Sequence, residues 1–428
     1  MLKCKMSDLL VKEKSGIYGL GLPAEQYSEE RIRYLRISDI DDSGCVINTD
    51  MKSVSSENIE EYILQENDLV VARTGNSTGR TYMYKKSDGI MAYAGFLIKY
   101  VFDETKINPR YMRYFCLSDY YKSQIEGFVG STRGNMSAQD FKTIHVFYPD
   151  RSSQDKMVRL LDLIEEKIEV NNRINDNLAH YLNDIYIHWF LQFDFPNKEG
   201  KPYKSSGGKL IWNDEVKRSI PVNWNVDKLG NIFTSERGIS YSTQNISSGK
   251  GNPMINLANF APGGGAYKSS GLKHFDGTYA SNKVLKPYDL VMCNTQQTAI
   301  DFDKDIIGRA MLVPDIFDED ILSSHHVNVI RPHNLFMKEY LLFLFNSEFF
   351  HKYISGHTNG TNILGLVFSG VEDYKTEIPP DYVLEAFSAI VLNAEAIKSS
   401  ILRENRSLCS IRQYLMPMLM SGQATIAD

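Results

Sequence analysis

The sequence has few cysteines, and no pattern links them. They are Cys4, Cys45, Cys116, Cys293 and Cys409, and no two of them form a Cys-x-x-Cys pair. An odd number of widely spaced cysteines argues against a disulfide framework, and the missing pair argues against a structural zinc site. Such cysteines are typical of a reducing compartment, so we expect the protein to work in the cytoplasm.

A long apolar run is also missing. No stretch reaches the roughly 18 residues that a membrane-spanning helix needs. The first residues, Met1 to Lys5, lead directly into polar sequence without the features of a signal peptide. We therefore expect no membrane partner. Hydrophobic residues make up 43% of the 428 residues and charged residues 23%, which is typical of a folded chain with room for two domains.

Positive charge is not in excess, because the formal net charge is −6. A free-standing DNA-binding protein is usually basic, since neutralisation of phosphates supplies most of its affinity. The charge therefore counts against a uniformly basic DNA-binding protein. A DNA-binding function would require basic residues gathered on one face, or a partner that completes the interface.

The motifs of the expected enzyme classes are absent. An adenine methyltransferase needs Asp/Asn-Pro-Pro-Tyr/Phe to hold a flipped base, and the nearest strings, at Asn108–Tyr111 and Ile378–Asp381, do not fit. No G-x-x-x-x-G-K-[ST] phosphate loop is present. Pro149-Asp150 followed by Glu165–Lys167 matches a nuclease string, but Glu165 and Lys167 fall in a predicted helix rather than on strands that converge on Mg²⁺.

His325 and His326 are the remaining candidate metal ligands, and no third ligand lies at a useful spacing. We interpret them as a structural pair in a strand. The sequence therefore predicts a protein that is not an enzyme, with no catalytic residues, no metal site and no cofactor of its own.

The chain does contain an internal repeat with a period of about 220 residues. Leu35–Ser38 corresponds to Ile255–Ala258, and Asp68–Val70 recurs as Asp289–Val291. The period is too long for a solenoid repeat. Two copies of one module are the simpler explanation. In each copy, short β-rich runs alternate with Gly, Ser and Asn turns, and helical patches rich in aromatics follow, at Arg110–Tyr121 and Met337–Tyr353.

A long helix is predicted to end each copy. Apolar residues recur in steps of four and three from Met157 to Trp189, which is the spacing of a heptad seam. Ser152 and Asp155 resemble a capping box at its start. A helix of about 36 residues is near 55 Å long, and its narrow apolar stripe requires a partner helix. The seam residues are Met157, Leu161, Ile164, Ile168, Asn171, Asn175, Leu178, Leu182, Ile185 and Trp189.

The second copy has a similar but less regular seam, after Pro379-Pro380-Asp381. If a two-fold axis relates the copies, the two helices run antiparallel with one globular domain at each end. Buried Asn residues in such a seam weaken it but fix its register. An isolated helix pair with no spacing role is the alternative. The residues of the second seam are Phe387, Ile390, Ala394, Ile397, Ile401, Asn405, Leu408, Ile411 and Leu415.

These patterns predict an α+β fold, with two mixed α/β domains joined by two long helices that form an antiparallel coiled coil with an internal pseudo-two-fold repeat. The expected divisions are a first recognition domain at 1–150, a first spacer helix at 151–191, a linker at 192–220, a second recognition domain at 221–381 and a second spacer helix at 382–428.

Several segments of the chain resemble the specificity subunits of type I restriction–modification systems. The segments Trp189–Asn197 and Gly200–Lys209 resemble the linker between their two repeats, and Ile220–Trp224 resembles the lead-in to their second target-recognition domain. Leu419–Gly422 resembles their usual last turn. The order of recognition domain, long helix and linker, followed by a second recognition domain and helix, extends the resemblance over essentially the whole chain.

The resemblance implies a non-catalytic subunit that binds double-stranded DNA and reads a split, asymmetric site. It also implies two methyltransferase subunits, which carry S-adenosylmethionine, and translocase/nuclease restriction subunits as partners. The helices would keep the two halves of the site at a fixed distance. The alternative is a coiled-coil scaffold protein whose end domains bind peptides or lipids, which the acidic charge fits slightly better.

Two classes of loop contain the residue types that read base edges. Arg pairs with guanine and Asn with adenine in the major groove, although surface turns favour Gly, Ser and Asn for backbone reasons alone. Correspondence between the copies is loose, because Asn294–Thr298 lacks the Arg-Thr-Gly of the first copy. The candidate DNA-binding residues are Arg73, Thr74, Asn76, Ser77, Arg80, Ser131, Thr132, Arg133 and Asn135 in the first copy, and Asn294, Thr295, Gln296, Gln297, His357, Thr358, Asn359, Thr361 and Asn362 in the second.

Overall fold

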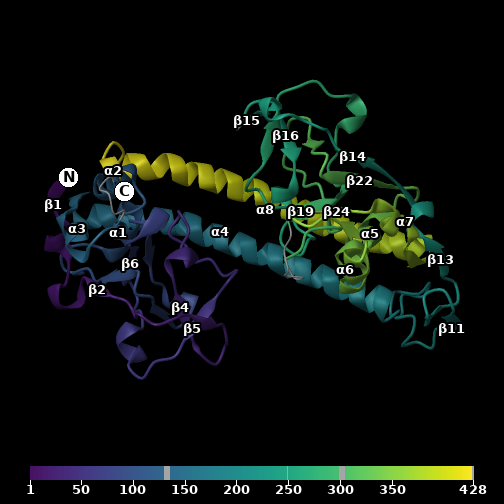
Figure 1. Cartoon of the computed structure of the whole chain (residues 1–428), viewed down its shortest axis with the longest axis horizontal. Helices are drawn as coiled ribbons and strands as arrows, with labels where there is room; N and C mark the ends of the chain where they lie inside the picture. Colours follow the sequence, from purple (N-terminus) through teal and green to yellow (C-terminus); the bar gives the residue numbers. More distant parts are fainter. Residues whose placement is uncertain (130–134, 248, 298–303, 427–428) are drawn as a thin grey trace. The chain divides into compact units, whose positions relative to one another are not determined.

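The computed structural model describes residues 1–129, 135–247, 249–297 and 304–426. The chain divides into two compact units: unit 1 comprises Met1–Glu169 with Ser407–Asp428, and unit 2 comprises Val170–Arg406. Each unit has a mixed α/β part and contains segments of two long helices, α4 (Arg151–Tyr186) and α8 (Asp381–Ser421) (Figure 1). Within the described ranges, no helix is long and apolar enough to cross a membrane.

The strands of unit 1 form two four-stranded sheets and one two-stranded sheet. They are β1 (Leu2–Lys5), β2 (Ile17–Tyr18), β3 (Glu25–Gln26), β4 (Ile32–Leu35), β5 (Lys52–Val54), β6 (Leu69–Ala72), β7 (Thr81–Met83), β8 (Met91–Tyr93), β9 (Leu97–Tyr100) and β10 (His145–Tyr148). The sheet orders are β2-β9-β6-β7, β3-β5-β4-β8 and β1-β10. Strand β6 is apolar throughout and fully buried, as expected for a central strand.

Three sheets of unit 2 repeat the strand orders of unit 1: β14-β22-β18-β20, β15-β17-β16-β21 and β13-β25. In each of the two units one parallel pair, β4–β8 or β16–β21, joins antiparallel neighbours. Unit 2 also contains the sheets β11-β12 and β19-β24-β23. The repeat seen in the sequence is thus present in the strand order. The strands are β11 (Leu210–Asn213), β12 (Arg218–Pro221), β13 (Asn225–Lys228), β14 (Phe233–Arg237), β15 (Ile246–Ser247), β16 (Asn252–Ile255), β17 (Lys273–Phe275), β18 (Leu290–Cys293), β19 (Thr295–Gln297), β20 (Ala310–Leu312), β21 (Leu322–Ser323), β22 (Val327–Pro332), β23 (Thr358–Asn359), β24 (Ile363–Leu366) and β25 (Lys375–Ile378).

Each predicted helical patch consists of two short helices instead of one. A serine separates them: the Ser118 hydroxyl accepts a hydrogen bond from the backbone N–H of Tyr121 (3.3 Å), and the Ser347 hydroxyl from that of Phe350 (3.2 Å). Serine is a preferred residue at helix N-termini for this reason. The short helices are α1 (Pro109–Phe115), α2 (Asp119–Val129) and α3 (Ala138–Thr143) in unit 1, and α5 (Met337–Asn346), α6 (Glu348–Ser355) and α7 (Phe368–Asp373) in unit 2.

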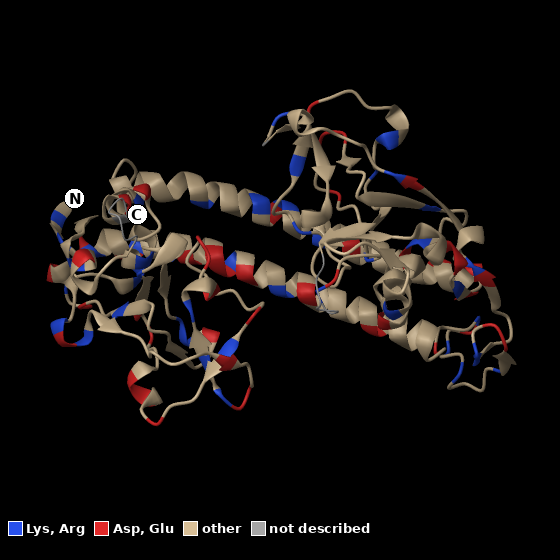
Figure 2. Ribbon diagram, in the orientation of Figure 1, with Lys and Arg blue, Asp and Glu red and all other residues tan. Residues whose placement is uncertain are grey.

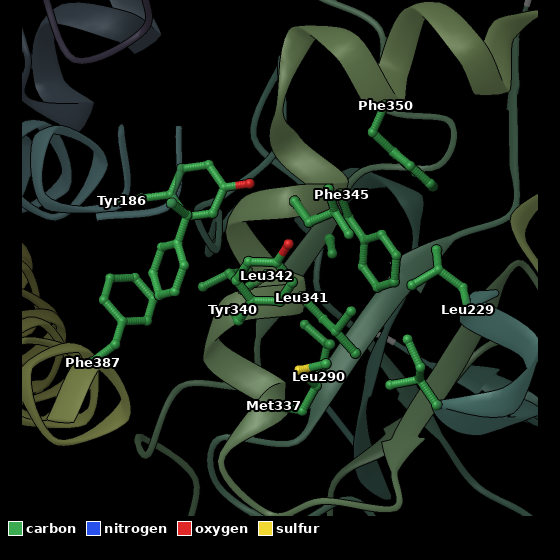
Figure 3. Packing of buried hydrophobic residues seen from close by; sticks show 14 of the residues in the cluster. Tyr186, Leu229, Leu290, Met337, Tyr340, Leu341, Leu342, Phe345, Phe350 and Phe387 are labelled. Atoms are coloured by element: carbon green, nitrogen blue, oxygen red, sulfur yellow. The ribbon is translucent and has the colours of Figure 1, made fainter. Parts of the chain in front are cut away.

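The core of unit 2 is rich in aromatic rings. Helices α5 and α6 contribute Tyr340, Phe345 and Phe350, and the two long helices contribute Tyr186 and Phe387 (Figure 3). Most aromatics of the predicted helical patches are therefore core residues, but Tyr120 is 40% exposed and Phe349 is 68% exposed. Burial raises the pKa of the Tyr340 hydroxyl, which lies 3.0 Å from the Thr376 hydroxyl.

The core of unit 1 includes the end of helix α8. Leu419 and Met420 are buried in one cluster with Met157 and Leu161 of helix α4 and with the aromatic residues of helix α1. Residues from the last helical turn of the chain thus contribute to the hydrophobic core of the unit that holds the N-terminus.

The start of helix α4 differs from the predicted capping box. The carboxylate of Asp150 accepts hydrogen bonds from the backbone N–H (3.1 Å) and the hydroxyl (2.8 Å) of Ser153, which lower the pKa of Asp150. Asp155 instead pairs with Arg151 at 2.8 Å. Asp150 is therefore the capping residue, because it lies just before the first helical turn.

The predicted stripe of helix α8 is wrong at two positions. Ile397 is 49% exposed and Ile411 is 46% exposed. The covered stripe passes instead through Val391 and Lys398, whose ammonium pairs with Glu395 at 2.6 Å, and through Arg412. The prediction assigned only apolar residues and Asn to the stripe. It missed Lys398 and Arg412, because the long side chains of Lys and Arg cover part of the stripe with their methylene groups.

Helices α4 and α8 contact each other inside each unit. In unit 2, Trp189 lies 6.0 Å from Phe387 between ring centroids, and Asn171 donates a hydrogen bond to Glu404 at 2.7 Å. Within unit 2, the earlier residue of helix α4 therefore contacts the later residue of helix α8, as in an antiparallel pair. In unit 1, Arg412 lies 3.6 Å from Glu165, which also pairs with Arg113.

Candidate nucleic-acid interface

The first predicted reading loop follows strand β6 of unit 1. The backbone holds Arg73 on two sides: its N–H donates to the carbonyl of Phe96 (3.0 Å), and its carbonyl accepts from the N–H of Met136 (2.8 Å). The guanidinium lies over the ring of Tyr18, 5.1 Å from the centroid. Arg73 is thus oriented by a cation–π contact at the edge of the domain.

The second reading loop of unit 1 meets the first one. Thr74 and Asn135 form an antiparallel bridge, so the segments that start at residues 73 and 135 lie side by side. Asn76 and Asn135 are exposed, and Thr74 and Ser77 are half-buried. The other predicted residues of this loop, Ser131, Thr132 and Arg133, lie outside the described residues.

Arg80 has several partners within its own unit. Its guanidinium donates to the carbonyl of Ile40 (2.9 Å) and to the hydroxyl of Ser77 (3.3 Å), and it forms an ion pair with Asp42. Helix α2 supports the same segment, since the Tyr121 hydroxyl donates to the carbonyl of Gly79 at 2.8 Å. Arg80 therefore stabilises the conformation of the loop, whereas Asn76, at the tip of the loop, is exposed.

Unit 2 brings its two predicted loops together in a sheet. Strand β19, within the predicted segment Asn294–Gln297, pairs with strand β24, which in turn pairs with strand β23 at Thr358-Asn359. Thr295 lies opposite Gly365, and Gln297 opposite Ile363. The sequence pattern predicted loops here, but Gln297 and Asn359 lie on strands of a small sheet, and Thr361 and Asn362 lie between strands β23 and β24.

Two of the predicted reading residues are buried. Asn294 is 2% exposed, and its amide donates to the carbonyl of His325 (3.1 Å) and to the side chain of Asn328 (2.6 Å). Gln296 is 4% exposed, and its amide oxygen accepts from the backbone N–H groups of Ile306 (2.8 Å) and Ile307 (2.9 Å). Their amides are engaged inside the unit, so both side chains shape the loop.

The neighbours of these two residues face outward. Gln297, Asn359, Thr361 and Asn362 are exposed. Along a strand, successive side chains point to opposite faces, which explains why Gln296 is buried while Gln297 is not.

His357 and Thr358 are half-buried beside helix α6. The ring of His357 lies 4.4 Å from that of Tyr353, and its Nδ1 lies 3.1 Å from the Tyr353 carbonyl. The hydroxyl of Thr358 donates to the carbonyl of Ser355 at 3.2 Å. Both residues fix the start of the hairpin that carries Asn359.

His325 and His326 lie in a turn between strands β21 and β22, not in a strand as predicted. Their rings are 3.9 Å apart between centroids, and Nδ1 of His326 lies 2.8 Å from the hydroxyl of Thr295. Burial lowers the pKa of His326. Within the described ranges, no group of three His, Cys, Asp or Glu residues is arranged to hold a metal.

Basic and acidic residues are interspersed in both units (Figure 2). Among the described residues of the reading loops, Arg73 and Arg80 are the cationic side chains, and Arg80 is already paired. Most of the charge that would neutralise DNA phosphates is therefore not in these loops.

Sequence reasoning missed Tyr18 and His326, which support the loops from distant parts of the chain. Tyr18 precedes Arg73 by 55 residues, and His326 follows Thr295 by 31. Neither lies in a motif, because such contacts are created by strand pairing.

Comparisons with known proteins agree with these features. Residues 22–180 match the model of the type I restriction modification DNA specificity domain. The chain is 23% identical over 318 residues to the type I restriction enzyme MjaIX specificity subunit of Methanocaldococcus jannaschii, covering 73% of this chain and 67% of that protein. Its fold is similar to that of the type I restriction–modification S subunit from M. genitalium, with a TM-score of 0.57 and 15% identity over 98% of this chain and 95% of that one.

Proposed function

The chain belongs to the family of type I restriction–modification specificity subunits, and from that premise we propose that it reads a DNA site in two separate parts, one with each unit. Members of this family are non-catalytic subunits that recognise DNA, so the chain is not an enzyme by itself. The scaffold alternative is not favoured by these comparisons.

The observation that carries the proposal is that in both units the segment after a central strand pairs with a second segment distant in the sequence. Thr74 pairs with Asn135 in unit 1, and Thr295 pairs with Gly365 in unit 2. In each case the first loop follows a buried central strand, β6 or β18, which gives it a rigid base. Side chains held on such a base can read bases with little loss of conformational entropy.

We assign direct reading to the exposed or outward-facing residues. In unit 1 these are Asn76 and Asn135, and we add the half-buried Arg73, whose guanidinium lies over the ring of Tyr18. Ser131, Thr132 and Arg133 are further candidates from the sequence. In unit 2 they are Gln297, Asn359, Thr361 and Asn362. The remaining candidates, Thr74, Ser77, Arg80, Asn294, Thr295, Gln296, His357 and Thr358, are proposed to hold the loops in shape.

The domain divisions remain part of the proposal: recognition domains at 1–150 and 221–381, spacer helices at 151–191 and 382–428, and a linker at 192–220. We propose that the helices form an antiparallel coiled coil along their length, related by a pseudo-two-fold axis. The contacts between Trp189 and Phe387 and between Glu165 and Arg412 support this pairing.

We propose that two methyltransferase subunits and the restriction subunits assemble on this chain, with S-adenosylmethionine bound by the methyltransferase subunits. The net charge of −6 supports this, because a partner would then supply the positive charge that DNA requires. Host DNA as the substrate implies that the complex works in the cytoplasm.

The test compares Arg73→Ala with Asn359→Ala in the complex with the methyltransferase partner, by sequencing the methylated motif of the host. We expect each substitution to relax one half of the motif and leave the other half unchanged. A lost bidentate base contact costs about 1–3 kcal/mol, whereas a lost phosphate contact weakens all sequences alike. A change in both halves from either single substitution would overturn the modular proposal.

A further inference from the structure

A hollow of about 590 Å³ in unit 1 is lined in part by Phe96. Its lining is mostly apolar and includes Leu20, Leu22, Tyr34 and the ring of Phe96. The hollow belongs to the same edge of the domain as the reading loop, because Arg73 is hydrogen-bonded directly to Phe96 through the backbone.

The turn that carries Phe96 is held rigidly. It connects strands β8 and β9, and the N–H of Gly95 donates to the carbonyl of Leu20 (2.8 Å), while the N–H of Leu97 donates to that of Ala94 (2.8 Å). Nevertheless, Phe96 is 57% exposed. Single exposed apolar residues are common on protein surfaces and need no explanation. Phe96 differs from these because its turn is fixed and because it is hydrogen-bonded to Arg73, which we assign to read a base.

Unit 2 has the same turn with different residues. The N–H of Asn294 donates to the carbonyl of His326 (2.9 Å), as that of Arg73 does to Phe96. Leu20 pairs in parallel with Ala94, and Ile239 pairs in parallel with Ser324. Gly95 and Phe96 therefore correspond to His325 and His326.

In unit 2, three rings lie together at the equivalent turn. The ring of His325 lies 5.5 Å from that of Tyr241 and 3.9 Å from that of His326. Because Gly95 stands at the position of His325, no such ring covers Phe96. The difference between the copies thus leaves an apolar ring uncovered in unit 1 and places polar rings in unit 2.

We propose that Phe96 is a specificity-determining residue that contacts the 5-methyl group of a thymine in the major groove, next to the base pair that Arg73 contacts. The inference rests on the proposed function of unit 1. Apolar side chains, Phe among them, read thymine through this methyl group. Part of the ring is covered by the domain and lines the hollow, so the ring suits a surface contact better than insertion between stacked bases.

The experiment measures binding of the full chain, with its methyltransferase partner, to duplexes that carry its methylated motif. Each thymine of the motif is replaced in turn by uracil, which removes only the methyl group. We expect one replacement, in the half-site that depends on Arg73, to weaken binding about fourfold, which corresponds to the burial of one methyl group. Phe96→Ala should bind the thymine and uracil duplexes equally, and Phe96→Leu should still discriminate between them.

Ile90→Ala is the matched control, because Ile90 is 66% exposed and precedes strand β8, whereas Phe96 follows it. It should keep the thymine preference. If no uracil replacement affects the wild type, or if Phe96→Ala retains the effect, the inference is wrong while specific binding to the motif still stands. Loss of all preference for the motif by the wild-type complex would instead contradict the proposed function.

Discussion

Asn171 of helix α4 donates a hydrogen bond from its side-chain amide to the side-chain oxygen of Asn405 in helix α8, over 2.8 Å. Asn171 is 1% exposed, so this polar contact is buried between the two helices. Asn405 in turn donates to Asn172 at 3.0 Å. Such a pair contributes little to stability but makes shifted registers unfavourable, because a shift would bury the Asn171 amide without a partner.

We expect Asn171→Leu to raise the thermal stability of the chain and to weaken the register of the helix pair. Removal of a buried amide favours burial of an apolar side chain, while shifted registers no longer leave an unpaired amide. The readout is the methylated motif, which should show more than one spacing between its halves. Asn177→Leu, at an exposed position of helix α4, should keep a single spacing. A single spacing in Asn171→Leu would contradict the role of the pair in register.

Removing one heptad from each helix, residues 171–177 and 399–405, should shorten the spacer of the motif. The two segments face each other at Asn171 and Asn405, and loss of seven residues removes about 10 Å. B-DNA rises about 3.4 Å per base pair, so the gap should shrink by up to about three base pairs. Removal of three base pairs also rotates one half-site relative to the other by roughly 100°. Because this rotation opposes the full shortening, we expect the gap to shrink by at least one base pair. An active variant with an unchanged gap would show that the helices do not set the distance between the two halves of the motif.

Gln296 and Gln297 are neighbours with opposite expected effects. Gln296→Ala leaves the buried N–H of Ile307 without its acceptor, which costs about 1–3 kcal/mol. We expect it to lower the melting temperature and weaken the unit 2 half-site without changing its bases. Gln297→Ala should change base preference at one position and leave the melting temperature unaffected. The reverse pattern would show that the outward face of strand β19 does not read DNA.

Glu339 is a buried carboxyl on helix α5, and burial raises its pKa. The folded state therefore favours the protonated form of Glu339. The contribution of Glu339 to the stability of the fold is complete below the pKa that this carboxyl has in the unfolded chain, and it is lost as the pH rises through the pKa in the folded chain. We expect Glu339→Gln to raise the melting temperature at pH 8 more than at pH 5. Glu385→Gln, at an exposed position of helix α8, is the control and should show no such difference. An equal effect at both pH values would argue that Glu339 stays charged.

The sequence predicted the repeat and the long helices well, because both depend on local periodicity. Helix α4 covers Arg151–Tyr186 and contains most of the seam expected from Met157 to Trp189. The errors occurred where polar residues take apolar positions. Lys398 lies in the stripe of helix α8 and Ile397 does not, and only the partner surface decides which of the two is covered.

The candidate site was predicted as two separate loop classes, and their contact through Thr74 and Asn135 was not. Pairing between residues so far apart in sequence leaves no local signal. Burial inside the loops also has no local sequence signal. Asn294 and Asn359 have the same side chain, but Asn294 is buried and donates hydrogen bonds to His325 and Asn328, which lie more than 30 residues away in the sequence.

The packing of Leu419 and Met420 into the core of unit 1 affects the order in which the chain folds. Domains generally fold during synthesis, starting with the N-terminal one. Residues 1–169 are synthesised before the segment 407–428 that completes their core, and unit 2, formed by Val170–Arg406, is synthesised between them. The nascent unit 1 exposes the apolar surface of Met157 and Leu161 throughout that interval, so we expect chaperones to bind it. A ribosome that stalls after Arg406 would release a chain in which unit 2 is complete and the core of unit 1 is not.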